Sequence, residues 1–229
     1  GIKQKFENFR NEGIFEQDDE PCFYIYRQVK DGRSHLGLIA LASVEEYQKG
    51  IIRIHEQTLA EREEKLKEYL TVCDFNAEPV CLTHPFNIEL DTFLQAESHK
   101  APLYDFSCDN IHHGVWKISG KENVAAMQEY FKNIPYLYIA DGHHRAASST
   151  LLAEMKKKEN SSHTGQEPYN FFMAAFFAET ELSIFNFDRM VNSLNGHTTE
   201  SFLTETSRYF DIVHKGKEAC KPSCANEIS

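Results

Sequence analysis

The sequence predicts an α+β (mixed α/β) fold, in which helices flank a mixed sheet within a single domain over residues 1–229. Two aromatic and aliphatic runs, 21–29 and 35–42, lie on either side of the turn signal Lys30-Asp31-Gly32 and predict a β-hairpin. Residues 169–179 are apolar nearly throughout, which is typical of a central strand. Strand and helix patterns alternate unevenly, and this favours a mixed sheet over a doubly wound parallel one.

The helices of the first third of the chain carry start and stop signals. Residues 3–13 predict a helix that ends at its final glycine. The segment 43–46, Ser-Val-Glu-Glu, fits a capping box that begins a short helix ending at Gly50. A second box, Thr-Leu-Ala-Glu at 58–61, predicts the start of a longer helix with one apolar face.

The later elements follow from shorter patterns. His112 and His113 are assigned to a turn between two strands, and a final helix and strand are expected to end at 211–215. The other predicted elements are a strand at 79–84, a helix at 87–99, strands near 103–108 and 113–118, a helix at 122–132, a strand at 136–140 and a helix at 143–157.

The composition restricts the classes of partner. With 24 Lys and Arg against 35 Asp and Glu, the formal net charge is −11, which disfavours nucleic acid and anionic membrane surfaces. A small anionic molecule can still bind where hydrogen-bond donors cluster. No apolar run approaches the roughly 18 residues of a membrane span.

The cysteines indicate a reduced, cytoplasmic protein. The six cysteines are scattered with no C-x-x-C motif, and a chain of this size does not need disulfides to fold. Cys220 and Cys224 could form a weak metal or disulfide pair, or be plain loop cysteines. The chain begins with Gly and ends without a closing element, so a fragment of a longer protein is expected.

The densest group of functional residue types lies at 141–145, directly after a predicted strand. Asp141 would end the strand, Gly142 would permit a tight turn, and His143, His144 and Arg145 would form the first turn of a helix. Free N–H groups and the helix dipole at such a start favour phosphate, and an arginine there can bind it through two hydrogen bonds. The pattern therefore predicts a phosphate-binding turn, in which Asp141 holds a metal ion or orients a histidine.

The alternative is structural: Asp141 would cap the helix and the histidines would be half-buried. Five functional residue types after a buried strand favour the binding site instead. Zinc is less attractive, because His143 and His144 point about 100° apart on a helix and cannot easily share one ion.

A second candidate is His55-Glu56. It begins like the metalloprotease helix H-E-x-x-H, but Leu59 stands where the second histidine belongs, so that motif fails. Glu56 could be a general base, a magnesium ligand or a solvated loop carboxylate. Asp188 and Arg189 could form a structural ion pair or reach the pocket.

Four segments in this order resemble DUF1015, a bacterial-type family of uncharacterised function. They are Tyr-Ile-Tyr-Arg-Gln at 24–28, Ser-Val-Glu-Glu-Tyr at 43–47, Ile-His-Glu-Gln-Thr at 54–58 and Ala-Asp-Gly-His-His-Arg-Ala at 140–146. The resemblance runs over most of the chain and implies a longer protein. At 186–189 the chain has Asn-Phe-Asp-Arg where Pro-Tyr-His-Arg is expected, which keeps Arg189 but puts a role for position 188 in doubt.

More remotely, Asp-Gly-His-His-Arg resembles the phosphate-binding signature of the ParB and sulfiredoxin superfamily, which includes free-serine kinases. This resemblance implies a ParB/sulfiredoxin-like core around the strand, turn and helix at 136–157. The sulfiredoxin nucleophile is a cysteine, and His143 stands in its place, so the sulfinic-acid chemistry is not implied. A ParB-type DNA-binding module is not visible.

These observations together favour a nucleotide-dependent phosphotransferase acting on a small hydroxy metabolite, with serine or phosphoserine as the substrate that the superfamily suggests. Mg²⁺ and ATP or ADP are the expected cofactors. The assigned roles are as follows: Gly142, His143, His144, Arg145 and Arg189 bind phosphates, Asp141 binds Mg²⁺ or orients a histidine, and Glu56, beside His55, takes the substrate proton. The same chemistry directed towards water or ADP would make a phosphatase, and a nucleotide-binding regulatory module without turnover is the alternative from another class.

Overall fold

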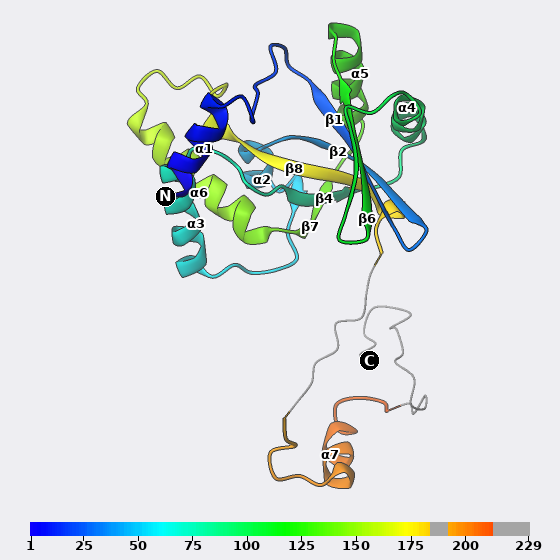
Figure 1. Cartoon of the computed structure of the whole chain (residues 1–229). Coiled ribbons are helices and arrows are strands. Elements are labelled where there is room, and N and C mark those ends of the chain that lie inside the picture. Colours follow the sequence, from blue (N-terminus) through cyan, green and yellow to red (C-terminus); the bar gives the residue numbers. More distant parts are fainter. Residues whose placement is uncertain (184–191, 213–229) are drawn as a thin grey trace. The chain divides into compact units, whose positions relative to one another are not determined.

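The computed structural model describes residues 1–183 and 192–212 (Figure 1). Packing of the backbone divides the chain into two compact units, Gly1–Leu182 and Ser183–Ser229. The second unit contains helix α7, Thr199–Thr206, which begins with Thr198 accepting a hydrogen bond from the Ser201 N–H. The mixed sheet lies in the first unit, and the expectation of one domain over 1–229 stays a prediction.

The first unit is built on an eight-stranded sheet in the order β3-β7-β4-β8-β2-β1-β6-β5. Two pairs, β3–β7 and β4–β8, are parallel and the other pairs are antiparallel, so the predicted mixed sheet with flanking helices is confirmed. The strands are β1 (Phe23–Lys30), β2 (Arg33–Ser43), β3 (Ile52–Arg53), β4 (Val80–His84), β5 (Tyr104–Cys108), β6 (Ile111–Ile118), β7 (Leu137–Asp141) and β8 (Phe171–Ala178).

Helices and two short 3-10 turns complete this unit. Figure 1 places α1, α3 and α6 near one end of the sheet and α4 and α5 near the other. The helices are α1 (Ile2–Asn11), α2 (Val44–Gln48), α3 (Ala60–Cys73), α4 (Ile88–Ser98), α5 (Lys121–Lys132) and α6 (His143–Glu159), and the turns are Pro168–Asn170 and Glu179–Glu181.

The hydrophobic core lies where helices cover the sheet. On the central strand β8, Phe172 and Phe176 belong to the buried cluster, and the Phe176 ring packs edge-on against Phe131 of α5. Met173, Ala175 and Phe177 alternate with these residues on the other face, and Ala175 and Phe177 are also buried. Apolar side chains on both faces explain the nearly continuous apolar sequence of β8.

Two local predictions are confirmed in detail. Asp31 and Gly32 both have positive φ, 50° and 77°, and join β1 to β2 in a two-residue turn, as Asp-Gly pairs do in hairpins. The Ser43 side chain accepts hydrogen bonds from the N–H groups of Glu45 and Glu46 and so caps α2.

Two other predictions are wrong. The residue that precedes α3 is Leu59, without a side-chain cap, because the Thr58 hydroxyl donates to the carboxylate of Glu63 instead. His112 and His113 lie within β6. The turn before it is Asp109-Asn110, where both residues have positive φ.

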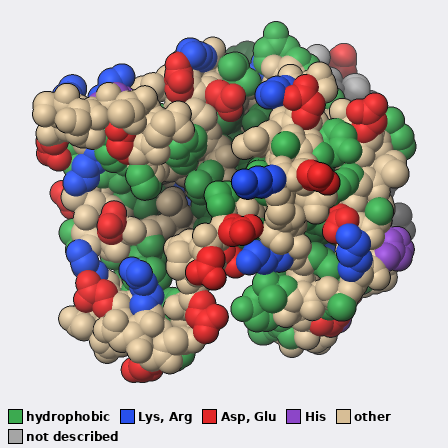
Figure 2. Space-filling model, turned by 90° about the horizontal axis from the view of Figure 1, so that it is seen from above, with side chains coloured by type: hydrophobic (Ala, Val, Ile, Leu, Met, Phe, Trp, Pro, Cys, Tyr) green, Lys and Arg blue, Asp and Glu red, His purple; other side chains and the backbone are tan. Residues whose placement is uncertain are grey.

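The surface has mixed charge. On the face shown in Figure 2, carboxylates and basic groups are interspersed among hydrophobic side chains. Local surroundings rather than the net charge therefore decide what binds at a given site. Among the described residues, no helix is long and apolar enough to cross a membrane.

The cysteines of the described segments are free thiols: Cys22, Cys73, Cys81 and Cys108. Cys220 and Cys224 lie outside the described residues, as does the end of the predicted final strand.

Candidate functional site

The candidate site lies where β3 and β7 end. These strands are parallel, with Ile52 opposite Leu137 and Arg53 opposite Tyr138, so their carboxyl ends meet at the same edge of the sheet. The chain after β3 carries His55 and Glu56, and the chain after β7 turns at Gly142 into α6. This pairing brings two segments that are distant in sequence into contact.

The turn between β7 and α6 requires a glycine. Gly142 has φ +97° and ψ 27°, a left-handed conformation that strains other residues. A β-carbon there would also lie 2.8 Å from Nε and 2.9 Å from Nη2 of Arg145, since that guanidinium folds back over the turn. The predicted strand, turn and helix are confirmed, with Asp141 as the last residue of the strand.

The start of α6 has no side-chain cap. Asp141 does not fill that role, because its carboxylate pairs with Nη2 of Arg145, which excludes the structural alternative of an N-cap aspartate. The first N–H groups of the helix are therefore left to an external acceptor or to water.

The remainder of α6 packs tightly through small side chains. Ala146 and Ser148 are fully buried, and the hydroxyls of Ser148, Ser149 and Thr150 donate to carbonyls one turn earlier. These residues fix the helix against the sheet and so fix the position of its first turn.

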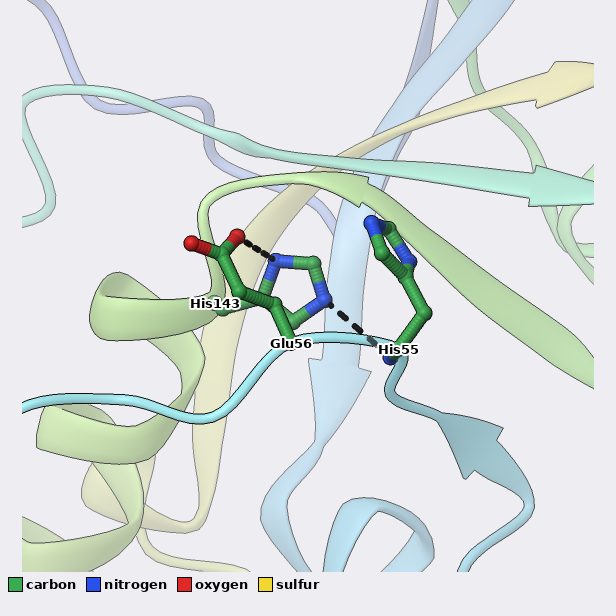
Figure 3. A group of neighbouring side chains, drawn as sticks. All are labelled: His55, Glu56 and His143. Carbon is green, nitrogen blue, oxygen red and sulfur yellow. Dashed lines mark hydrogen bonds and ion pairs between the residues drawn. The ribbon is translucent and has the colours of Figure 1, made fainter. Parts of the chain in front are cut away.

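His143 is the buried residue at the centre of the site. Its side chain is 3% exposed, and its Nδ1 lies 3.4 Å from Oε2 of Glu56, a carboxylate that is 62% exposed (Figure 3). On the other side of the ring, Nε2 accepts a long hydrogen bond, 3.5 Å, from the backbone N–H of His55. The His55 and His143 rings meet edge to face, with centroids 4.5 Å apart.

Burial favours the neutral form of His143. Desolvation lowers its pKa below the ordinary value, the nearby His55 lowers it further, and the carboxylates of Glu56 and Asp141 oppose the shift only in part. Because Nε2 accepts from the His55 N–H, the proton of the neutral ring lies on Nδ1, the nitrogen that faces the Glu56 carboxylate.

Arg145 points away from His143, because residues two apart on a helix face roughly opposite directions. Its Nη1 lies 2.6 Å from Oε2 of Glu78, just before β4, so two largely exposed carboxylates hold this one guanidinium. β4 runs antiparallel to β7, and Cys81 lies opposite Asp141, which places the segment before β4 beside the turn. Glu78 is a member of the site that no local sequence pattern indicated.

A pocket of ≈ 260 Å³ opens beside Arg145, between α3, α6 and the sheet. Its walls are mainly apolar, with Arg145 and Glu78 supplying charged groups at one side. The apolar residues of its lining include Leu66, Leu70, Val80 and Phe172.

The structure thus brings most of the predicted site residues to the start of α6, but their side chains form two clusters that point in different directions. Glu56, His55 and His143 form one cluster, and Asp141 and Arg145 form another on the opposite side of the same helix start. The Nδ1 atom of His144 is buried without a hydrogen-bond partner among the described residues. Asp188 and Arg189 lie outside the described residues.

Comparison with known proteins gives one match. A family model described as "Protein of unknown function (DUF1015)" matches residues 1–229. No curated protein and no solved structure matches the chain. The remote likeness to the ParB and sulfiredoxin superfamily therefore stays a prediction.

Proposed function

The chain belongs to the DUF1015 family, and we propose that it is a nucleotide-dependent phosphotransferase that acts on a small hydroxy metabolite. The observation that carries this proposal is the contact between the Glu56 carboxylate and His143 at the uncapped start of α6. A candidate proton acceptor thus lies beside a candidate anion site, and phosphoryl transfer needs both in one place.

The phosphates bind at the start of α6. Its free N–H groups and the positive end of the helix dipole attract an anion, and the Arg145 guanidinium lies directly over the turn. His144 adds a further hydrogen-bonding group. The pocket between α3 and α6 accepts the organic part of the nucleotide or of the substrate, because Arg145 and apolar side chains line the same pocket.

Mg²⁺ enters with the nucleotide. Asp141 and Glu78 give the surroundings of Arg145 an excess of negative charge, which repels phosphates that arrive without a cation. Asp141 would hold the Mg²⁺, and Arg145, free of Asp141, would then bind the phosphate oxygens. The ion pair between Asp141 and Arg145 is then the resting state of the site.

The reaction itself is the transfer of a phosphoryl group to the hydroxyl of the substrate. Glu56 accepts the proton that the hydroxyl oxygen loses as it bonds to phosphorus, and the nucleotide leaves with the electrons of the broken P–O bond. His143, whose Nδ1 lies 3.4 Å from Oε2 of Glu56, holds the carboxylate in position. Serine and phosphoserine are the first substrates to test, the latter because the reverse transfer to ADP or water uses the same groups.

Turnover assays of the whole protein with Mg²⁺, ATP or ADP, and serine or phosphoserine test the proposal. Glu56→Gln is expected to reduce turnover about 10²- to 10⁴-fold and to leave nucleotide binding intact, because it removes only the proton acceptor. Arg145→Ala is expected to weaken nucleotide binding about 10- to 100-fold, because it removes charge-assisted hydrogen bonds. The matched control is Arg62→Ala, which removes an exposed arginine of α3.

Two results would contradict the proposal. If Arg145→Ala binds nucleotide as tightly as Arg62→Ala does, the turn is not the phosphate site. If nucleotide binds at the turn but the protein turns over none of the four combinations, the chain is a nucleotide-binding regulatory module.

A further inference from the structure

We propose that His55, Glu56 and His143 bind a divalent transition-metal ion, separate from the Mg²⁺ that accompanies a nucleotide. One ligand atom from each of these side chains lies within 4.8 Å of the other two. Within the described residues, this is the group of histidine, cysteine and acidic side chains that meets such a spacing. Two segments that meet only in the fold supply it, as Figure 3 shows.

The geometry needs a small adjustment to hold an ion. Ligand atoms about 2.1 Å from one tetrahedral ion lie roughly 3.4 Å apart, so a separation at the 4.8 Å limit would have to close by about 1.4 Å. Nδ1 of His143 and Oε2 of Glu56 are already 3.4 Å apart, and an ion at this pair would take the place of the Nδ1 proton, which would move to Nε2. His143 is buried and fixed, whereas the side chains of His55 and Glu56 are exposed and belong to a loop, so these two can rotate towards it.

The donor set selects the ion. Two imidazoles and one carboxylate suit Zn²⁺, Mn²⁺ or Fe²⁺, whereas Mg²⁺ prefers oxygen ligands and an octahedral shell. Three protein ligands leave at least one coordination position open, which is the arrangement of catalytic rather than structural sites. An oxygen of the substrate hydroxyl or of a phosphate fits that position.

The ion changes the part that Glu56 plays. With an ion bound, Glu56 would be a ligand, and a substrate hydroxyl at the open position would lose its proton to water more readily than a free hydroxyl does. Neighbouring groups are less suited to the ion: Asp141 is paired with Arg145, and His144 points away from His143 on the helix.

Calorimetric titration of the whole protein with Zn²⁺, without nucleotide, tests the site. We expect one tight site for Zn²⁺, a weaker one for Mn²⁺ and little heat from Mg²⁺. His55→Ala and Glu56→Gln should each weaken Zn²⁺ and Mn²⁺ binding at least about tenfold. Mn²⁺ belongs in the test because thiolates such as that of exposed Cys108 compete for Zn²⁺ but little for Mn²⁺.

The matched control is His112→Ala. His112 also lies close to a carboxylate, with Nε2 3.2 Å from Oδ1 of Asp105, but this pair is partly exposed and no third ligand joins it among the described residues. Circular dichroism verifies that each variant is folded, and both substituted loop residues are exposed.

The inference is overturned if neither ion binds, or if His55→Ala and Glu56→Gln bind Zn²⁺ and Mn²⁺ as tightly as His112→Ala does. The titration contains no nucleotide, so the metal site can fail while the phosphotransferase proposal stands, and the reverse also holds. A metal-dependent turnover lost in His55→Ala but present in His112→Ala would join the two proposals.

Discussion

Substitution of Gly142 by alanine tests how the turn before α6 is built. Position 142 has φ +97°, and the added β-carbon would come within 2.8 Å of the Arg145 side chain. Gly50 is the matched control: its φ is +73°, but a β-carbon there meets nothing within 4 Å. Both variants incur left-handed strain of about 1–2 kcal/mol, and Gly142→Ala alone must also displace Arg145.

The displacement adds a second loss of free energy of unfolding. Arg145 is bound to Asp141 and Glu78, whose side chains are 77% and 74% exposed, and exposed ion pairs contribute little. We expect their disruption to cost about 1 kcal/mol in total. For a unit of this size that corresponds to a melting temperature about 2–4 °C lower for Gly142→Ala than for Gly50→Ala.

Urea and thermal denaturation, followed by circular dichroism, measure both variants. Adding Arg145→Ala to each completes the comparison, because without the guanidinium the difference between positions 142 and 50 should disappear. Equal stability of Gly142→Ala and Gly50→Ala, or a difference that persists without Arg145, would refute the account of the turn.

Two further predictions concern buried residues of the sheet. Burial lowers the pKa of His84 below its ordinary value near 6.5, so the contribution of neutral His84 to the free energy of unfolding is complete above that pH and is lost as the pH falls towards the lower folded-state pKa. The loss of unfolding free energy between about pH 8 and about pH 5 should therefore be smaller in His84→Leu than in the wild type. An equal loss in the two proteins would contradict this prediction. Gly37→Ala should lower the urea midpoint by the equivalent of about 1–3 kcal/mol, because the added β-carbon would lie 2.5 Å from the Phe177 ring and 2.6 Å from the Phe176 carbonyl oxygen. A midpoint equal to that of the wild type would show that β2 and β8 can move apart to admit the β-carbon at no cost in stability.

Local chemistry made several elements predictable. The Asp31-Gly32 turn and the Ser43 cap involve residues within a few positions of one another, so short patterns suffice. The Thr58 box failed because the residue before α3 is Leu59, and the Thr58 hydroxyl donates to the Glu63 carboxylate rather than accepting from the first N–H groups of the helix. At His112-His113 the pattern misplaced the turn, since Asp109 and Asn110 tolerate positive φ better.

Part of the candidate site was also predictable from local sequence, and part was not. The row Asp-Gly-His-His-Arg at 141–145 follows an apolar strand, and that local order is enough to predict a strand, a turn that needs glycine and an uncapped helix start. The neighbours of this row were not predictable. No pattern in either segment alone predicts that Arg145 contacts Glu78 or that His143 contacts His55.

The sequence by itself therefore determined the family, the mixed sheet and the strand, glycine turn and helix start around 141–145, because each depends on neighbouring residues. Only the tertiary structure decided which histidines come into contact. His143 and His144 diverge on their helix, whereas His55 reaches His143 because the two-residue strand β3 pairs in parallel with β7. The packing of the whole sheet determines which strands pair. A strand of two residues is too short to show the periodic pattern from which a strand is predicted.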